Sequence, residues 1–574
     1  MSSTPHAAQP PDSEPGSHAR RWPALFVVLL AAFMDLADNT IVTVALPEIQ
    51  RDLKATNADL QWVAAGYALA FAIMLITGGR IGDVFGRKKT FIAGIVGFTV
   101  ASALAGAAQN PETLIGSRTL QGAMAAVMIP QVLTYIQVSF TSKERPKALG
   151  LYGMILALAG VSGPLLGGIL INADVFGWGW RTIFLVNIPI GVIAVIGTAV
   201  LMPESRAEHA RRLDLGGVLL VTLALFAVFY PLVQGRDLDW PVWTYLTMAA
   251  SVPLLVLFVL YERHKSRKDD SPLIDLGLFR ERGVVPGLFV ALIFFAGGSF
   301  FFILTLHIQI ALGYTPLRAG LTFLPFAFGV IIGSGAATQL APRVGRMVVS
   351  IGSLAMGGAV GGMIYTLTRT GGDLSPWHLV PSMVVAGIGL ACVSATIVNI
   401  TLARVSSRHA GSASGVVNTT VQLSAAVGIA VIGAIFFGLL STNSASAARE
   451  GTAGLGRALA SAGVSQTDAE QAVGSVNDCF RDRMSSDDAS TNPASCGQLF
   501  SRLELSTPQA SDQVLEAVRR ATIADFLRSS EQSLWCVVGL LGLSFLASFL
   551  LPVGPVKTGK PENGSNQETR ITIS

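Results

Sequence analysis

The sequence predicts an all-α protein that crosses a membrane fourteen times. Apolar residues make up 51% of the 574 residues and charged residues only 13%, whereas soluble domains average about 25% charged residues. Apolar runs of about 20 residues, the length that crosses a bilayer core as a helix, recur along the whole chain. Because an open sheet would leave backbone groups without partners in lipid, each run is expected to be helical.

The apolar runs set the order of the predicted elements. The first run follows a polar tail and is longer than the apolar core of a signal peptide, about 7–15 residues, so it is expected to remain as a membrane helix. The 60 glycines suit close helix packing in lipid. The fourteen predicted spans lie near 24–46, 60–78, 90–108, 113–136, 146–171, 181–201, 213–233, 243–261, 283–311, 318–340, 348–367, 377–402, 411–439 and 533–552.

Positive charge predicts the direction of the spans. Lys and Arg are concentrated in alternate short loops, which the positive-inside rule places in the cytoplasm, together with both termini. Two spans separate two groups of six. The expected domains are a cytoplasmic N-terminal tail (1–23), an N-terminal six-helix half (24–201), two extra helices with cytoplasmic linkers (202–282), a C-terminal six-helix half (283–552) and a cytoplasmic C-terminal tail (553–574).

One long polar segment, 440–532, interrupts the second half and is expected to be an extracytoplasmic loop. Weak helical periodicity near 512–527 slightly favours helical pieces over a mobile loop. Cys479 and Cys496 both lie in this segment. An oxidising compartment would allow a disulfide between them, and two free thiols are an equally good interpretation.

Several kinds of site are missing from the sequence. Residues 86–90 resemble a phosphate-binding loop only superficially, and no G-x-x-x-x-G-K-[ST] segment occurs. No Cys/His cluster has metal-ligand spacing, no nucleophile elbow appears, and no basic stripe predicts nucleic-acid binding. The chain is therefore expected to be no enzyme, to hold no metal or cofactor, and to draw on an ion gradient for uphill transport.

The loop after the second span has a more specific sequence pattern than the positive-inside rule alone would require. It reads GGRIGDVFGRKK over residues 78–89, with glycines for close helix approach and opposed charges. This pattern resembles the hallmark loop of the major facilitator superfamily, which implies a major facilitator fold of two six-helix halves with a cytoplasmic gate. The alternative is a plain charged loop. The expected gate residues are Gly79, Asp83, Gly86, Arg87 and Lys88.

The resemblance also implies a latch between the halves. Asp83 would hold the outward-facing state by meeting the start of the span at Gly411, with Arg404 or Arg408 nearby. The matching loop of the second half carries Pro342 in place of the acid, so the gate is expected to be asymmetric. Such internal repeats are typical of transporters, with the substrate site near the midplane between halves.

Two carboxylates, Asp35 and Asp38, interrupt the first span. Three residues apart, they share one helix face, and a charge in mid-membrane costs several kcal/mol and is seldom kept without a role. Burial favours the neutral form of a carboxyl group, which carries a proton. The segment from Asp38 to Pro47 is similar to the first-helix signature of the fourteen-helix drug:proton antiporters, which implies proton coupling at Asp38; Thr43 replaces that family's usual Asn. The alternative is a carboxylate held by a fixed partner.

Arg118 interrupts the fourth span at a similar depth. At 1.5 Å per residue it lies about 7.5 Å from the outer edge, and Asp38 about 12 Å, so their side chains can meet if the helices are neighbours. Leu114, Arg118, Gln121 and Gly122 match the L-x-x-x-R-x-x-Q-G motif of the superfamily, which implies a role for Arg118 in proton coupling. The alternative is an arginine that snorkels to the headgroups.

The fifth span contains a Gly-Pro pair that is expected to bend the helix. Its neighbouring glycines would form a flat face for tight packing. The segment resembles the antiporter motif of exporters in the superfamily, although Ala159 stands where that motif has glycine. The alternative is an ordinary kinked membrane helix. The expected antiporter-helix residues are Gly163, Pro164, Gly167 and Gly168.

A substrate cavity between the halves is expected to carry mixed aromatic and polar side chains. A helix aromatic is also often a packing residue, which is the alternative for each candidate. The candidates are Trp62, Tyr67, Gln131, Tyr135, Phe301, Phe302, His307, Asn418 and Gln422.

These features favour a proton-coupled antiporter, acting as a monomer, that exports small lipophilic or cationic drugs, antibiotics or related metabolites across the plasma membrane. Its expected partners are the small-molecule substrate, protons and the lipid bilayer. The first alternative is a proton-coupled symporter that imports a small solute, against which the Gly-Pro helix argues. A membrane sensor and a channel are further alternatives, and the substrate is not named by the sequence.

Overall fold

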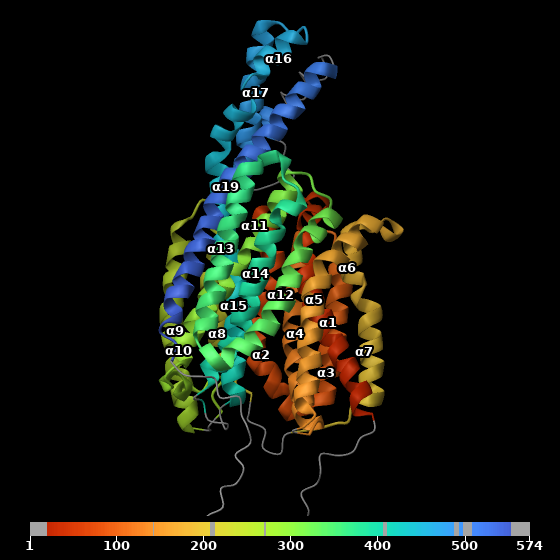
Figure 1. The fold of residues 1–574 in the computed structure, drawn as a ribbon, viewed down its shortest axis with the longest axis vertical. Coiled ribbons are helices and arrows are strands. Elements are labelled where there is room, and N and C mark those ends of the chain that lie inside the picture. The colour runs from red at the N-terminus through yellow and green to blue at the C-terminus, as the bar shows by residue number, and fades with distance from the viewer. Residues whose placement is uncertain are drawn as a thin grey trace, which may run out of the picture.

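The chain forms an upright bundle of helices with one long projection (Figure 1). The computed structural model describes residues 20–141, 143–206, 213–268, 271–403, 405, 410–486, 493–496 and 508–552. In these ranges, thirteen helices are long and apolar enough to cross a membrane, or fourteen if the bent pair Arg145–Gly160 and Ser162–Ala173 counts as one span. The all-α class and the count of fourteen predicted spans are thereby confirmed.

The first group of helices comes from the N-terminal part of the chain. A capping box between Thr56 and Asp59 starts its second helix, and Asn110 caps the fourth, with Pro111 in the first turn. The members are α1 (Arg21–Leu53), α2 (Asn57–Phe85), α3 (Arg87–Gly106), α4 (Pro111–Ser139), α5 (Arg145–Ala173), the short helices η1 (Val175–Gly177), η2 (Gly179–Arg181) and α6 (Thr182–Leu185), and α7 (Asn187–Leu201).

Two further helices, α8 (Leu215–Gln234) and α9 (Val242–Lys268), precede the second group. The short η3 (Leu276–Arg280) then leads into it. The second group consists of α10 (Val284–Ala296), η4 (Gly297–Ser299), α11 (Phe300–Leu306), the π-helix η5 (His307–Ala311), α12 (Pro316–Val344), α13 (Met347–Thr370), η6 (Gly371–Asp373), α14 (Pro376–Leu402), α15 (Ala410–Gly451), α16 (Leu455–Ser461), α17 (Gln466–Ser485) and α19 (Pro508–Ser548).

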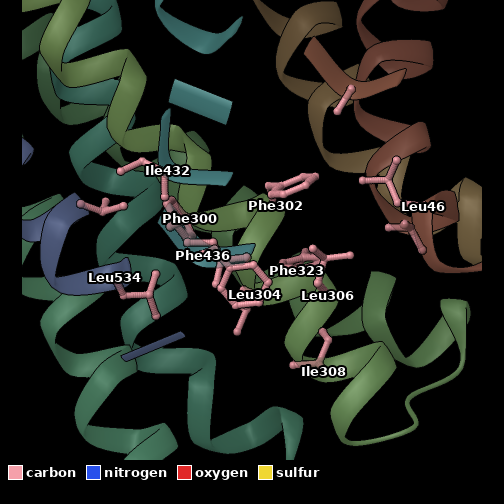
Figure 2. Close-up of a cluster of buried hydrophobic side chains, with 14 of the residues drawn as sticks. Leu46, Phe300, Phe302, Leu304, Leu306, Ile308, Phe323, Ile432, Phe436 and Leu534 are labelled. Carbon is pink, nitrogen blue, oxygen red and sulfur yellow. The ribbon is translucent and has the colours of Figure 1, made fainter. Parts of the chain in front are cut away.

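The largest core that the two groups share lies toward one end of the bundle, and a smaller one joins α2 to α8 and α15. We call the end where α1 begins and α19 ends the basal end, and the opposite end the apical end. The largest buried apolar cluster joins Leu46 of α1 to Phe302 and Leu306 of α11 (Figure 2). A second cluster, which includes Leu25 and Phe140 near the basal end, is built from the first group alone. In the described residues, the groups are therefore closed against each other at the apical end.

The segment 440–532, expected as a loop, is largely helical where the structure describes it. Helix α15 continues to Gly451 and α19 begins at Pro508, and both project from the apical end beside α16 and α17 (Figure 1). The apolar faces of α16, α17 and α19 bury a small core around Leu455 and Val476. This packing stabilises helices in a segment whose average composition is polar. The expected lean to helical pieces is confirmed.

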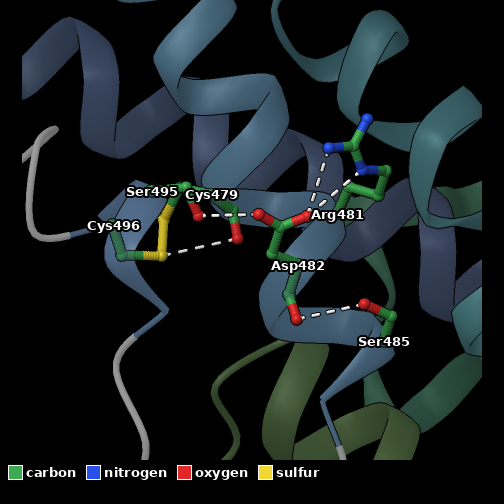
Figure 3. The surroundings of a disulfide bond; sticks show 6 residues. All are labelled: Cys479, Arg481, Asp482, Ser485, Ser495 and Cys496. Carbon is green, nitrogen blue, oxygen red and sulfur yellow. Dashed lines mark hydrogen bonds and ion pairs between the residues drawn. A yellow bond between two sulfur atoms is a disulfide. The ribbon is translucent and has the colours of Figure 1, made fainter.

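Cys479 and Cys496 form a disulfide inside this projection (Figure 3). The bridge ties the end of α17 to the short turn that follows it, and Ser495 donates a hydrogen bond of 2.9 Å to the Asp482 carboxylate beside it. Of the two states that the sequence left open for these cysteines, the structure has the bridged one.

Candidate functional site

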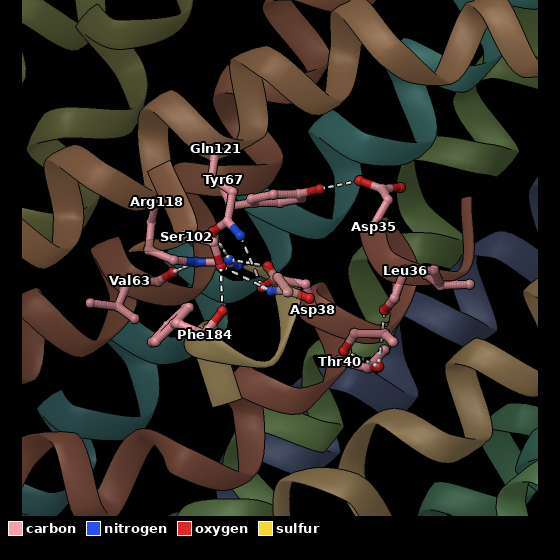
Figure 4. A network of polar contacts seen from close by, with 12 residues as sticks. Asp35, Leu36, Asp38, Thr40, Val63, Tyr67, Ser102, Arg118, Gln121 and Phe184 are labelled. Atoms are coloured by element: carbon pink, nitrogen blue, oxygen red, sulfur yellow. Dashed lines mark hydrogen bonds and ion pairs between the residues drawn. The ribbon is translucent and has the colours of Figure 1, made fainter. Parts of the chain in front are cut away.

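A buried ion pair joins α1 to α4. Arg118 Nη1 lies 2.5 Å from Asp38 Oδ2, and neither side chain is exposed to solvent. The second oxygen of the same carboxylate, Oδ1, accepts hydrogen bonds from Gln121 Nε2 at 2.9 Å and from Asn187 Nδ2 at 2.6 Å (Figure 4 shows the surroundings of the pair). The structure thus brings together Asp38 and Arg118, the two charged residues that the helical rise of about 1.5 Å per residue predicted at similar depths.

Asn187 and Ser102 complete the surroundings of the carboxylate, and neither was among the predicted site residues. Asn187 Nδ2 also lies 2.9 Å from Ser102 Oγ, and that hydroxyl donates to the Phe184 carbonyl at 2.8 Å. The ion pair is thereby linked to α3 and α7 as well as to α1 and α4. The available signal was an uncharged amide inside the apolar span 181–201, which is weaker than a charge.

Arg118 is held by more than its counter-charge. Its guanidinium lies 4.4 Å from the centre of the Tyr67 ring, a cation–π contact. Nη1 also donates to Gln121 Oε1 at 2.7 Å, and Nε reaches the Val63 carbonyl at 3.5 Å. Nη2 is buried and has no hydrogen-bond partner among the described residues, so one face of the cation keeps a free donor.

Asp35 belongs to the same network through Tyr67. The Tyr67 hydroxyl donates to Asp35 Oδ1 while the ring of the same side chain covers the Arg118 guanidinium (Figure 4). Asp35 is partly exposed, whereas Asp38 is 2% exposed. Tyr67, which was expected to line the cavity, therefore connects the partly exposed Asp35 to the buried pair of Asp38 and Arg118.

The gate loop forms an ion pair within itself and hydrogen bonds to the end of α7. Asp83 pairs with Arg87 at 3.1 Å, and Lys88 Nζ donates to the Ala199 carbonyl at 2.6 Å. Gly86 has a φ of 101°, a value that favours glycine. Space beside Gly82 is filled by Gln131, whose Oε1 would lie 2.1 Å from an added Cβ.

The predicted partners of Asp83 do not all fall in the described part of the chain. Arg404 and Arg408 lie outside the described residues, and Gly411 is described only as part of the α15 backbone. The latch between Asp83 and these residues therefore stays a prediction.

Helix α5 meets both groups through its small residues. A Cβ added at Gly163 would lie 1.9 Å from Thr40 Oγ1, and one at Gly167 would lie 2.8 Å from an Ile41 side-chain carbon. A Cβ at Gly168 would instead meet the backbone of Leu317 on α12 at 2.6 Å. The glycines on either side of Pro164 thus let α5 pack closely against both α1 and α12 toward the apical end.

Three of the cavity candidates have packing contacts in place of the expected cavity surface. Trp62 contacts aromatic rings of α8, including Phe229 at 5.0 Å between centroids. Gln131 donates to the Gly78 carbonyl at 3.0 Å, and Tyr135 donates to the Arg21 carbonyl at 3.1 Å. The packing of α8 on Trp62 could not be predicted from the sequence, because this contact joins distant parts of the chain.

The remaining candidates divide by exposure. Phe302 and His307 are buried, and His307 Nδ1 lies 3.0 Å from Ser530 Oγ. Phe301 is half-buried. Asn418 on α15 is exposed, and Gln422 one turn further is half-buried. These last two polar side chains therefore keep some exposed surface.

Comparisons with known proteins show the family of the chain. A family model described as Major Facilitator Superfamily matches residues 28–429. The probable actinorhodin transporter of Streptomyces coelicolor is 39% identical over 545 residues, which cover 94% of this chain and 93% of that protein. The puromycin resistance protein of Streptomyces alboniger is 35% identical over 74% of this chain and 83% of that protein. The tetracenomycin C resistance and export protein of Streptomyces glaucescens is 32% identical, with 73% and 77% covered.

Solved structures support the fold alone. A bacterial homolog to the human lysosomal transporter Spinster matches with a TM-score of 0.58 and 16% identity, over 93% of this chain and 97% of that one. A D-xylose–proton symporter matches with a TM-score of 0.51 and 13% identity, over 73% and 90%. The chain is a multi-pass membrane protein and a transporter of small molecules, not an enzyme, and it belongs to the Major Facilitator Superfamily.

Proposed function

We propose that the chain is a proton-coupled antiporter that exports a small lipophilic or cationic molecule, such as an antibiotic or related metabolite, across a bacterial plasma membrane. The observation that carries the proposal is the fully buried pair of Asp38 and Arg118. Removing the partner of a buried charge costs about 3–5 kcal/mol. A proton that neutralises Asp38 therefore changes the forces on Arg118 strongly.

The network around the pair supports coupling between that proton and the shape of the first group. Asp38 connects α1, α4 and α7 directly, and α3 through Ser102. Neutralising Asp38 weakens the attractions that hold these helices in one arrangement. A ligand that binds one arrangement better than another shifts the balance between them, and a proton is such a ligand.

Asp35 and Tyr67 supply an entry to the pair. The partly exposed Asp35 carboxyl is bonded to the Tyr67 hydroxyl, whose ring lies on Arg118. A proton or a cationic substrate arriving at Asp35 alters the field felt by Asp38, about one helical turn away on α1, and by its partner Arg118. Competition for the same carboxyl groups then gives exchange, with no cofactor beyond the proton gradient.

We further propose that the basal end, with both termini, is cytoplasmic and that the described state faces inward. The positive-inside rule supports this orientation, because the basal loops carry Arg87, Lys88 and Lys89 together. The groups share their core at the apical end, so a substrate would enter from the basal end. The relatives named for actinorhodin transport and for tetracenomycin C resistance and export support export over import.

Proton release from inside-out vesicles tests the function. Vesicles that contain the full chain are energised by acidifying the lumen, and a fluorescent pH reporter follows proton loss when ethidium, a lipophilic cation, is added. We expect ethidium-dependent proton release, and none with Asp38→Asn. Asp52→Asn is the matched control, because Asp52 also lies on α1 but pairs with Arg181 at the apical surface.

Two results would contradict the proposal. Across a panel of lipophilic cations and antibiotics, a complete lack of solute-dependent proton movement with Asp38 intact would exclude antiport. Movement of protons and solute in the same direction would favour the symporter instead.

A further inference from the structure

Two buried carboxyl groups converge on the extra helices α8 and α9, at the basal end. Asp214 precedes α8 and Glu262 lies near the end of α9; they are 1% and 0% exposed. A Cβ added at Gly217 would lie 2.4 Å from Glu262 Oε1 and 3.0 Å from Asp214 Oδ2, so the two groups meet at one point. Lys265 Nζ, 3.5 Å from Asp214 Oδ1, supplies a counter-charge. Burying carboxyl groups is unfavourable unless they gain specific bonds.

Those bonds go to one short segment of backbone. We call residues 271–275, between α9 and η3, the strap. The Leu273 N–H donates to Asp214 Oδ2 at 3.1 Å, and the Ile274 N–H donates to Glu262 Oε2 at 3.0 Å. The first three residues of the strap are buried. The extra helices thus hold the strap by its backbone donors.

The backbone acceptors of the same strap are held by the first group. Arg80, on α2 beside the gate loop, donates from Nη1 to the Ser271 carbonyl at 3.3 Å and from Nη2 to the Leu273 carbonyl at 3.1 Å. Nη2 also donates to the Pro272 carbonyl. Charge-assisted bonds of this kind are stronger than neutral ones. The strap is therefore fastened from both sides, by carboxylates and by a guanidinium.

The position of the strap gives these bonds a mechanical consequence. It continues through η3 into α10, the first helix of the second group. Fastening it to α2 shortens the free connection between the groups by five residues, each of which could span up to about 3.4 Å. The clamp exists in a state in which the groups are closed apically.

We propose that α8 and α9 are part of the basal gate, and that Arg80, Asp214 and Glu262 are positioning residues that clamp the strap and stabilise the inward-facing state. The proposal rests on the alternating access of the proposed function. It assigns a role to the two helices that stand between the two groups of six. A contact formed in one state and lost in the other shifts the population toward the first.

The distance between the basal ends of the two groups tests the clamp. Spin labels are attached at Lys89→Cys and Arg343→Cys, two exposed positions on α3 and α12. Cys392 and Cys536 are replaced by serine, and the disulfide is kept. Double electron–electron resonance on the full chain in lipid nanodiscs then gives the ratio of long to short distances.

We expect Arg80→Gln to lower the ratio of long to short distances about tenfold. The variant removes charge-assisted hydrogen bonds from the inward-facing state alone, so that state, which has the long distance, loses stability. Glu262→Ala should change the ratio in the same direction. The double variant should show less than the sum of both effects, since both residues act on one strap. Arg80→Lys keeps a donor and should restore part of the ratio.

Arg346→Gln is the matched control. Arg346 also bonds two carbonyls, of Phe549 and Leu551, each at 2.8 Å, but these belong to its own group. We expect the ratio to stay unchanged in this variant.

The clamp would be overturned by an unchanged distance ratio in monodisperse Arg80→Gln. If that variant fails to fold, an unchanged ratio in Glu262→Ala would overturn it. Proton exchange by the parent protein is measured in the same preparation. Its absence would count against the proposed function, while the distance ratio would still decide the clamp.

Discussion

The two groups of helices bury different chemistry at corresponding depths. The first group places the Asp38–Arg118 ion pair among amide and hydroxyl side chains. The second group places aromatic rings there, with Phe301 4.3 Å from Phe300 and 4.7 Å from Phe326 between centroids. Under the proposed function, the difference corresponds to a division of labour, in which the first group would respond to protons and the second would offer an apolar surface to a lipophilic solute.

The loop after α2 and the matching loop after α12 also differ, in what their arginines bind. Arg80 bonds a strap that leads into the other group, whereas Arg346 bonds the end of α19 within its own group. Both arginines bind carbonyl oxygens, yet only the first can tie the groups together. Sequence symmetry between the halves therefore does not imply that their loops have equal roles.

The largest effect should come from breaking the ion pair of the first group. Arg118→Ala leaves the Asp38 carboxylate without its counter-charge, which costs about 3–5 kcal/mol, and we expect more than about a 100-fold loss of proton exchange in vesicles. Arg346→Ala in the second group should retain most of the exchange. Wild-type exchange by Arg118→Ala would contradict the role given to the pair.

A smaller effect should follow from removing a neutral donor. Asn187→Leu deletes the 2.6 Å bond to Asp38, and a bond to a charged group contributes about 1.5–3 kcal/mol, so exchange should fall about tenfold. Asn399→Leu is the counterpart in the second group, because Asn399 donates to the Ala395 carbonyl of its own helix. Equal losses in the two variants would remove the distinction between the groups.

The aromatic surface of the second group should affect the solute more than the proton. Phe301→Ala removes one stacked and one edge contact, and aromatic contacts contribute about 0.5–1.5 kcal/mol beyond burial. We expect the half-saturating concentration of ethidium to rise about fivefold, with unchanged dependence of the rate on pH. Phe545→Ala, whose ring pairs with Phe549 near the basal end of α19, is the control. A change in pH dependence with unchanged saturation would refute this assignment.

The smallest effect on transport should come from the projection. Replacing Cys479 and Cys496 by serine frees a short loop, and a bridge of this size contributes about 3 kcal/mol to local stability. We expect faster proteolysis of the projection and less than about a twofold change in exchange, because its core is separate from the shared apical cluster. A large loss of exchange would place the projection inside the transport cycle.

What the sequence could predict depended on how unusual each residue was in its surroundings. Asp38 and Arg118 stand out because charges inside apolar spans are rare, and helical rise then places them at one depth. Asn187 makes a direct bond to the same carboxylate, yet an amide in a membrane span attracts little notice. Composition marks charges well and uncharged hydrogen-bonding groups poorly.

Contacts between helices that are distant in the sequence could not be predicted, for a different reason. Trp62 has an aromatic side chain on a helix predicted to border the cavity, and only the packing of α8 against α2 shows that it is partly buried. The strap bonds join residues about 190 positions apart, through backbone carbonyls that have no sequence signature. Helix existence follows from local pattern, but helix neighbours follow from the tertiary fold.

The projection has a practical consequence for imaging the transporter. Helices α15 and α19 have 42 and 41 residues and run without a break from the bundle into the projection, a length of about 60 Å at 1.5 Å per residue. A small membrane protein otherwise gives particle alignment few features outside its detergent or lipid belt. An antibody fragment raised against the projection would add a rigid landmark for cryo-electron microscopy. Because α15 and α19 both belong to the second group, such a fragment would report the orientation of that group from outside the belt.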